Sequence, residues 1–160
     1  QEIADLGPAP APEALAALPY LEVVCKECLR LYPPVVDPAR VARAPFELPG
    51  YTIPAGEVLR ASSALLHSRP ELYPEPGRFR PERFLERKYS PFEYIPFGGG
   101  ARRCLGAAFA MYELKVVVAT ILRRHSLRLL GTQPVVHARR ALSLGPRGGI
   151  PMVVQERRRA

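Results

Sequence analysis

One cysteine of this sequence has neighbours that could give it chemistry. Cys104 stands in the segment 97–106, which has glycines on both sides of the cysteine and two arginines just before it. The apolar run that follows predicts a helix over about 105–124, and the free N–H groups at a helix N-terminus stabilise a thiolate. The arginines add positive charge at the same place. A thiolate held in this way serves as a nucleophile or as a metal ligand.

These two alternatives differ in what else Cys104 needs. A nucleophilic cysteine needs a histidine base, and nothing in the sequence places His67, His125 or His137 beside it. A phosphate-binding loop is excluded because no Lys-Ser/Thr pair follows the glycines. A single thiolate ligand, glycines that admit a flat group and an arginine that neutralises a carboxylate suit haem. The residues therefore favour haem binding, and an ordinary buried cysteine is the alternative.

An α+β chain, mainly helical with small sheets, is predicted around this segment. Apolar residues at helical spacing predict a helix from Pro19 that Pro33 and Pro34 terminate. Turn signals and alternating apolar residues predict short antiparallel strands, which fall at 41–48, 51–53 and 58–61, with a short helix at 62–67. Three further strands are expected near 126–130, 135–144 and 150–154. The helix over 105–124 is apolar around much of its circumference, so we expect it to be buried.

Two segments lack a regular pattern. Residues 1–12 are rich in Ala and Pro and are predicted to be loose, which leaves residues 13–160 as the domain. Residues 69–100 contain six prolines but also many aromatic side chains. A long irregular segment in a compact domain is usually functional or disordered, and the aromatic content argues against disorder. We interpret it as an ordered meander.

The cysteine segment is similar to the haem-binding loop of the cytochrome P-450 family, F-x-x-G-x-R-x-C-x-G. That pattern is filled by Phe97, Gly100, Arg102, Cys104 and Gly106. Three further marks occur in the family's order: Glu27 and Arg30 as E-x-x-R, residues 81–84 as P-E-R-F, and residues 31–34 followed by Arg40. The similarity covers roughly residues 18–155. It implies the C-terminal part of the family's fold: E-x-x-R helix, small antiparallel sheet, meander, haem-loop cysteine, buried helix and terminal β-hairpin.

The resemblance also implies roles for single residues. Cys104 would be the proximal thiolate ligand of the iron of haem b (iron protoporphyrin IX), and its electron donation favours O–O cleavage. Arg40 and Arg102 would pair with the haem propionates. Phe97 would shield the sulfur, while Gly98 and Gly106 would let the porphyrin approach the backbone.

A second set of residues would act through structure. Glu27, Arg30 and Arg83 would form a buried salt-bridge triad that locks the meander onto the first helix. Two guanidiniums can share one carboxylate, and Glu27 and Arg30 lie one helical turn apart. Residues 35–39 and 141–143 match the family's substrate-recognition segments.

The implied activity is that of a haem-thiolate monooxygenase acting on a small organic, lipophilic substrate. Electrons would come from NAD(P)H through an acidic ferredoxin or flavoprotein reductase, steered by a basic face. That face would consist of Arg102, Arg103, Lys115, Arg123 and Arg124. The family's oxygen-activating helix lies before the position where this chain starts, so we expect a fragment whose activity alone is doubtful. A non-catalytic haem-binding module is the alternative.

Composition excludes several other classes of protein. A hydrophobic content of 48% excludes a disordered chain, and an odd count of 3 cysteines without a secretory signal disfavours a disulfide scaffold. Cys25 and Cys28 form a C-x-x-C pair, which we interpret as two small buried hydrophobes in a helix. Residues 101–160 carry 12 Lys/Arg against 2 Asp/Glu, which raises a nucleic-acid-binding domain as a further hypothesis. Because no nucleic-acid fold signature accompanies the charge, we predict no nucleic-acid partner.

The sequence contains no run of about 18 apolar residues that would span a membrane. The Arg-rich composition favours a cytoplasmic bacterial protein. A membrane anchor before Gln1, where the family carries its anchors, stays open.

Overall fold

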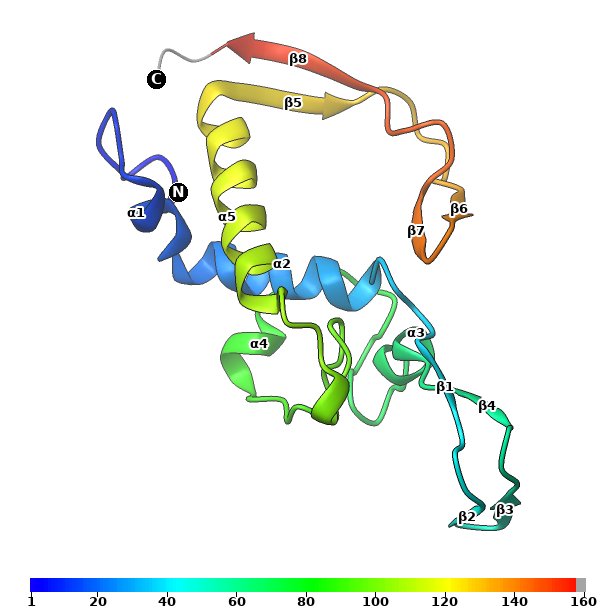
Figure 1. The fold of residues 1–160 in the computed structure, drawn as a ribbon. Helices are drawn as coiled ribbons and strands as arrows, with labels where there is room; N and C mark the ends of the chain where they lie inside the picture. The colour runs from blue at the N-terminus through cyan, green and yellow to red at the C-terminus, as the bar shows by residue number, and fades with distance from the viewer. Residues whose placement is uncertain (158–160) are drawn as a thin grey trace.

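Helix α2 (Pro19–Leu31) and helix α5 (Ala107–Arg124) form the centre of this computed structural model, which describes residues 1–157 (Figure 1). Pro19 occupies the first position of α2, where its missing N–H costs no hydrogen bond. The helix ends at Leu31, and Tyr32 is its non-helical C-cap, because the residue that precedes a proline is pushed out of the helical region. The sequence thus determines both ends of α2.

The other elements are short. The helices are α1 (Pro12–Ala16), α3 (Ser63–His67) and α4 (Arg83–Glu86), and a 3-10 turn η1 covers Gly100–Arg102. The strands are β1 (Ala39–Val41), β2 (Phe46–Leu48), β3 (Tyr51–Ile53), β4 (Val58–Arg60), β5 (His125–Leu129), β6 (His137–Arg140), β7 (Ser143–Pro146) and β8 (Met152–Arg157). The predicted meander, residues 69–100, contains the single turn of α4 and the first residue of η1 and is otherwise without helix or strand.

The strands pair as antiparallel two-stranded ribbons. β1 pairs with β4 and β2 with β3, and together they form an arm that projects beyond α3 (Figure 1). β5 pairs with β8, and β6 with β7. The prediction of one strand over 135–144 is wrong, because the chain reverses at Ala141, whose φ is 54°, and forms the β6–β7 hairpin.

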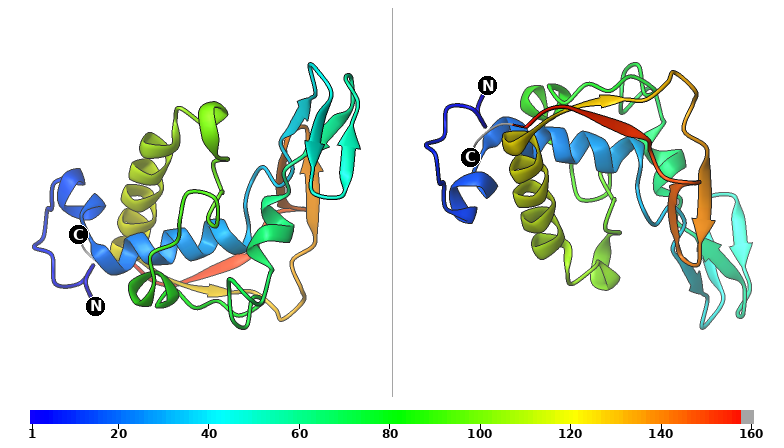
Figure 2. Two further views of the ribbon diagram at one scale, coloured as in Figure 1. Left: turned by 90° about the horizontal axis from the view of Figure 1, so that it is seen from below. Right: turned by 90° about the horizontal axis from the view of Figure 1, so that it is seen from above.

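The apolar core lies where α1, α2 and α5 meet. Its buried members are Leu15, Leu18, Leu21, Cys25 and Ala119. Figure 2 shows α1 and α2 beside α5 in two further views. The prediction of a buried α5 is wrong for much of the helix, since Phe109 is 69% and Val117 48% exposed. The physical reason is that α1 and α2 contact one side of the helix, whereas its apolar residues extend around most of the circumference.

The N-terminal residues lack a helix or strand before Pro12, yet they make defined contacts. The carboxylate of Glu2 accepts hydrogen bonds from the N–H groups of Tyr20 and Leu21, at 2.8 and 3.1 Å, and so caps α2. The Arg123 guanidinium donates to the carbonyls of Ile3, Leu6, Gly7 and Pro8. Within residues 1–157 no helix combines the length and the hydropathy needed to cross a membrane.

Candidate functional site

Cys104 lies between η1 and the start of α5, and it is exposed. Its backbone N–H donates to the carbonyl of Phe97 at 2.9 Å, which closes the loop. Gly98 and Gly100 have φ values of 75° and 65°, which side chains other than glycine adopt with strain. The loop is therefore shaped by its backbone, and Cys104 is exposed at its end.

The other predicted haem contacts lie on separate elements. Phe97 is half-buried and Arg102, in η1, is exposed. Arg40 lies on β1, exposed, and its guanidinium donates to the carbonyl of Ala39 at 2.7 Å. A Cβ built on Gly106 would lie 3.8 Å from the Cys104 Sγ, at ordinary contact distance.

The donor set around Cys104 fits haem. Within the part of the chain that the structure describes, no group of three or more His, Cys, Asp or Glu side chains could hold a metal ion. Haem iron needs only one protein ligand from this loop, the Cys104 thiolate, because the porphyrin supplies further ligands. The exposed guanidiniums of Arg40 and Arg102 are suited to carboxylates such as the propionates.

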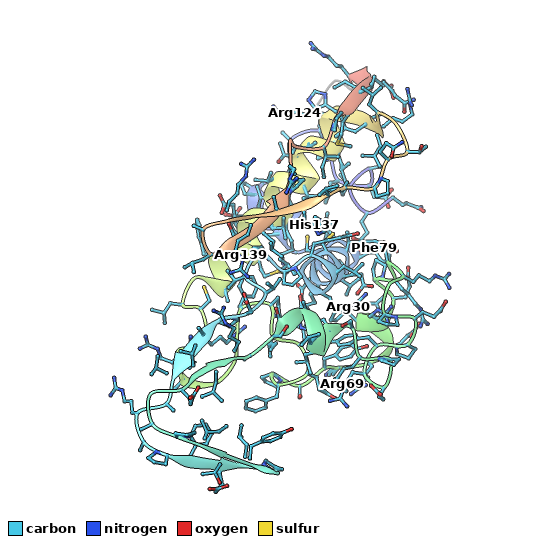
Figure 3. All side chains as sticks on the ribbon, turned by 90° about the vertical axis from the view of Figure 1, so that its right-hand side faces the viewer. Arg30, Arg69, Phe79, Arg124, His137 and Arg139 are labelled. Carbon is cyan, nitrogen blue, oxygen red and sulfur yellow. The ribbon has the colours of Figure 1, made fainter. Side chains whose placement is uncertain are left out.

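The structure brings Glu27, Arg30 and Arg83 together in the interior. Their exposed fractions are 0%, 2% and 2%. The Arg30 Nε lies 2.7 Å from Glu27 Oε2, and the Arg83 Nε lies 3.2 Å from Glu27 Oε1. The N–H of Arg80 donates to the same Oε1 at 2.8 Å. In Figure 3, Arg30 lies where α2 meets the green segments of the meander.

The remaining N–H groups of the two buried guanidiniums bind backbone carbonyls. Arg30 donates to the carbonyls of His67 and Pro76, each at 2.8 Å, and Arg83 donates to that of Pro74 at 3.0 Å. One carboxylate and several carbonyl dipoles therefore compensate two cations, and the meander backbone is wrapped around them.

His67 is a buried residue at the end of α3. It is 1% exposed, and burial lowers its pKa to about 4. Its Nε2 accepts from the N–H of Ile95 at 3.0 Å, while Nδ1 lies 3.2 Å from the carbonyl oxygen of Arg30. Because these partners are 28 and 37 residues away, no local pattern in the sequence could have revealed them.

The C-x-x-C pair lies on α2. Cys25 is buried and Cys28 is partly buried. Burial raises the pKa of Cys25 to about 11, and it also raises the pKa of Cys28. Both therefore remain thiols at neutral pH, which agrees with small buried hydrophobes.

Two of the five residues of the predicted basic face contact other parts of this chain. The Lys115 ammonium, 12% exposed, lies 3.3 Å from the carboxylate of Glu22 on α2. The Arg123 guanidinium is occupied by the N-terminal carbonyls described above. Arg102 and Arg103 remain exposed beside Cys104, whereas Arg124 is exposed at the far end of α5.

The segments that resemble substrate-recognition segments lie close together. The carboxylate of Asp37 binds Arg139 of β6 at 2.9 Å and Arg60 of β4 at 3.1 Å. The hydrogen bond from Arg139 is the main cause that lowers the pKa of Asp37. The N–H of Leu144 donates to the carbonyl of Pro34 at 2.7 Å, so the β6–β7 hairpin is fixed to the irregular segment between α2 and β1.

The chain is similar to known proteins in both sequence and structure. A model of the cytochrome P-450 family matches residues 3–150. The chain belongs to the cytochrome P-450 family. It is 41% identical over 155 residues to cyclooctat-9-en-7-ol 5-monooxygenase of Streptomyces melanosporofaciens, a match covering 94% of this chain and 33% of that protein. It is 48% identical over 108 residues to cytochrome P-450 135B1 of Mycobacterium bovis, covering 68% of this chain and 23% of the relative. The chain thus spans about a quarter to a third of these relatives.

Solved structures of family members confirm the predicted fold class. Retinoic acid-bound cyanobacterial CYP120A1 matches with a TM-score of 0.84 and 32% identity, over 95% of this chain and 36% of that one. The cytochrome P450DA heme domain matches with a TM-score of 0.85 and 25% identity, over 98% of this chain and 35% of that one. Haem, small organic substrates and electron supply by redox partners are general properties of the family.

Proposed function

We propose that this chain is the haem-anchoring part of a cytochrome P-450 monooxygenase that oxidises a small organic, lipophilic substrate. The observation that carries the proposal is the exposed Cys104 thiol on a glycine loop, closed by the hydrogen bond from its N–H to the carbonyl of Phe97. The monooxygenase relative that matches 94% of the chain supports it. Bacterial relatives and the Arg-rich composition support a cytoplasmic protein.

The residues of the loop would divide the binding of haem b between them. Cys104 would supply the thiolate, and Arg40 and Arg102 would pair with the propionates. Phe97 would limit access of water to the sulfur, and Gly98 and Gly106 would keep side chains away from the porphyrin. When bound, haem supplies the iron centre at which dioxygen is activated.

Glu27, Arg30 and Arg83 would retain the cofactor indirectly. They hold the meander on α2, and the meander leads directly into the cysteine loop. Arg102 and Arg103, exposed beside Cys104, would attract the acidic surface of a ferredoxin or flavoprotein that carries electrons from NAD(P)H.

The test compares Cys104→Ser with Cys28→Ser in the haem-loaded protein. Carbon monoxide is added after reduction, and the Soret band then reports whether a thiolate ligates the iron. We expect the thiolate band in the wild type and in Cys28→Ser and its loss in Cys104→Ser. An identical band in Cys104→Ser would contradict the proposal. A thiolate band without oxygen consumption driven by NAD(P)H and redox partners would identify a non-catalytic haem-binding module.

A further inference from the structure

His67 lies between the Glu27–Arg30–Arg83 cluster and the segment that leads into the cysteine loop. It is the last residue of α3, and the hydroxyl of Ser63 in that helix donates to the carbonyl of Val36 at 3.1 Å. The Ser63 N–H also donates to Val36, at 2.8 Å. Helix α3 is thereby fixed to the chain that follows α2, and the His67 ring is held in the interior.

The two ring nitrogens of His67 bind different elements. A backbone N–H can only donate, so the contact with Ile95 makes Nε2 an acceptor without a proton. A carbonyl can only accept, so Nδ1 carries the proton and donates to Arg30. The contacts therefore define a neutral imidazole of one tautomer. The charged and titratable groups around it are Glu27 and Arg30 of α2 and Tyr73 and Tyr94 of the meander.

The His67 ring also contacts Tyr94, the residue before Ile95. The two rings stack with centroids 5.5 Å apart and an interplanar angle of 25°. The Tyr94 hydroxyl donates to the carbonyl of Lys26 at 3.0 Å. Residues 94 and 95 are thus held from both sides, by stacking and by hydrogen bonds to α2 and α3.

A short path of hydrogen bonds leads from Ile95 to the cysteine. The carbonyl of Ile95 accepts from the N–H of Gly98 at 3.0 Å, which closes the turn at the start of the loop. The carbonyl of Phe97, the residue before Gly98, accepts from the N–H of Cys104 at 2.9 Å. The position of the Cys104 backbone therefore depends on a turn whose first residue is bound by His67.

His67 is also bound to the buried ion-pair cluster. Its carbonyl accepts from the Arg30 guanidinium at 2.8 Å, while its ring donates to the Arg30 carbonyl. One residue thereby touches both the Glu27–Arg30–Arg83 cluster and the segment that enters the cysteine loop.

We propose that His67 is a positioning residue for the Cys104 thiolate. Its contacts with Arg30 and Ile95 couple the position of the Glu27–Arg30–Arg83 cluster to that of the loop that carries Cys104. The inference rests on the proposed function for its reference to the thiolate. Without the His67 ring, the N–H of Ile95 would lose its partner, and the start of the loop 95–104 would no longer be held to α3.

Three variants separate the contacts of the ring. His67→Phe keeps the stacking surface and loses both hydrogen bonds. His67→Asn places an amide near Nδ1 and does not reach Ile95, whereas His67→Gln places an acceptor near Nε2. Ser68→Ala is the control, because the Ser68 hydroxyl caps α3 by donating to the carbonyls of Ala64 and Leu65 and, within residues 1–157, makes no hydrogen bond to the cysteine loop.

The first readout is the Soret band of the reduced carbonyl complex of the haem-loaded protein. We expect a several-fold larger share of iron without thiolate ligation in His67→Phe and His67→Asn, and a near wild-type share in His67→Gln and Ser68→Ala. A wild-type band in His67→Phe would overturn the proposal, as would a His67→Gln variant as impaired as His67→Phe.

The second readout needs no haem. Amide hydrogen exchange of the haem-free protein should accelerate in His67→Phe at residues 95–104 more than in α2, and His67→Gln should restore the protection. Unchanged exchange at 95–104, or an equal rise throughout α2, would overturn the proposal. If the wild type itself lacks a thiolate band, the proposed function fails, and the exchange data alone decide the role of His67 in placing the loop.

Discussion

Polar side chains next to α2 are buried and hydrogen-bonded, whereas the residues around Cys104 are exposed to solvent. Glu27, Arg30, His67 and Arg83 are at most 2% exposed, and each has hydrogen-bond partners from a distant segment. Residues 101–106 are all exposed, and backbone hydrogen bonds and glycine conformations hold their loop. Glu27, Arg30, His67 and Arg83 therefore form a frame that this chain's own side chains complete, whereas Cys104 is exposed on a loop held by its backbone.

The largest expected effect breaks the frame. Glu27→Ala leaves two buried guanidiniums without a carboxylate, so we expect the free energy of unfolding to fall by about 3–5 kcal/mol. Chemical denaturation of the protein measures it. Glu22→Ala is the matched control on the same helix, because the Glu22 side chain is 41% exposed and its partner Lys26 is 33% exposed; its second partner, Lys115 of α5, is 12% exposed. That control should lose less than about 1 kcal/mol, and equal losses in both variants would contradict the comparison.

A pH titration sharpens the comparison further. Burial holds the pKa of His67 at about 4, below its ordinary value of 6.5. Above pH 6.5 the imidazole is neutral in both states. As the pH falls from 6.5 to 4, the unfolded chain binds a proton that the folded chain resists, so stability declines by up to about 3 kcal/mol.

His67→Gln carries no titrating group at this position and should lack that part of the decline. The measurement is the difference between the unfolding free energies of wild type and variant over this pH range, in which the carboxylate contributions cancel. Parallel profiles would show that burial does not suppress protonation of His67.

The smallest effect is expected at the open region. Cys104→Ser in the haem-free protein replaces an exposed thiol with a hydroxyl of similar size, so the free energy of unfolding should change by less than about 0.5 kcal/mol. Thermal or chemical denaturation of the haem-free protein measures it. A loss comparable to that of Glu27→Ala would mean that Cys104 belongs to the frame.

Local signals in the sequence predicted those elements whose ends are set by their own residues. Pro19 and Pro33 bracket α2, and the turn residues around Gly50 and Gly56 separate the strands of the arm. The reversal at Ala141 was missed because alanine at a positive φ is unfavourable, and nothing in the composition of 135–144 marks a turn there.

The candidate site could be predicted only in part. The cysteine loop is a contiguous pattern, whereas Arg83 joined Glu27 and Arg30 through the resemblance to a family, since it lies 56 residues from Glu27 in the chain. His67 and the pairing of Lys115 with Glu22 depend on contacts between distant segments, which neither spacing nor composition specifies. The apolar circumference of α5 predicted burial because a sequence shows which side chains avoid water and does not show which elements cover them.

The Arg123 guanidinium has a consequence for how the N-terminal segment tolerates change. It donates hydrogen bonds to the backbone carbonyls of residues 3, 6, 7 and 8, and every amino acid has a backbone carbonyl. These four hydrogen bonds therefore do not depend on the identity of the side chains at positions 3, 6, 7 and 8, whereas a single replacement of Arg123 would remove all of them.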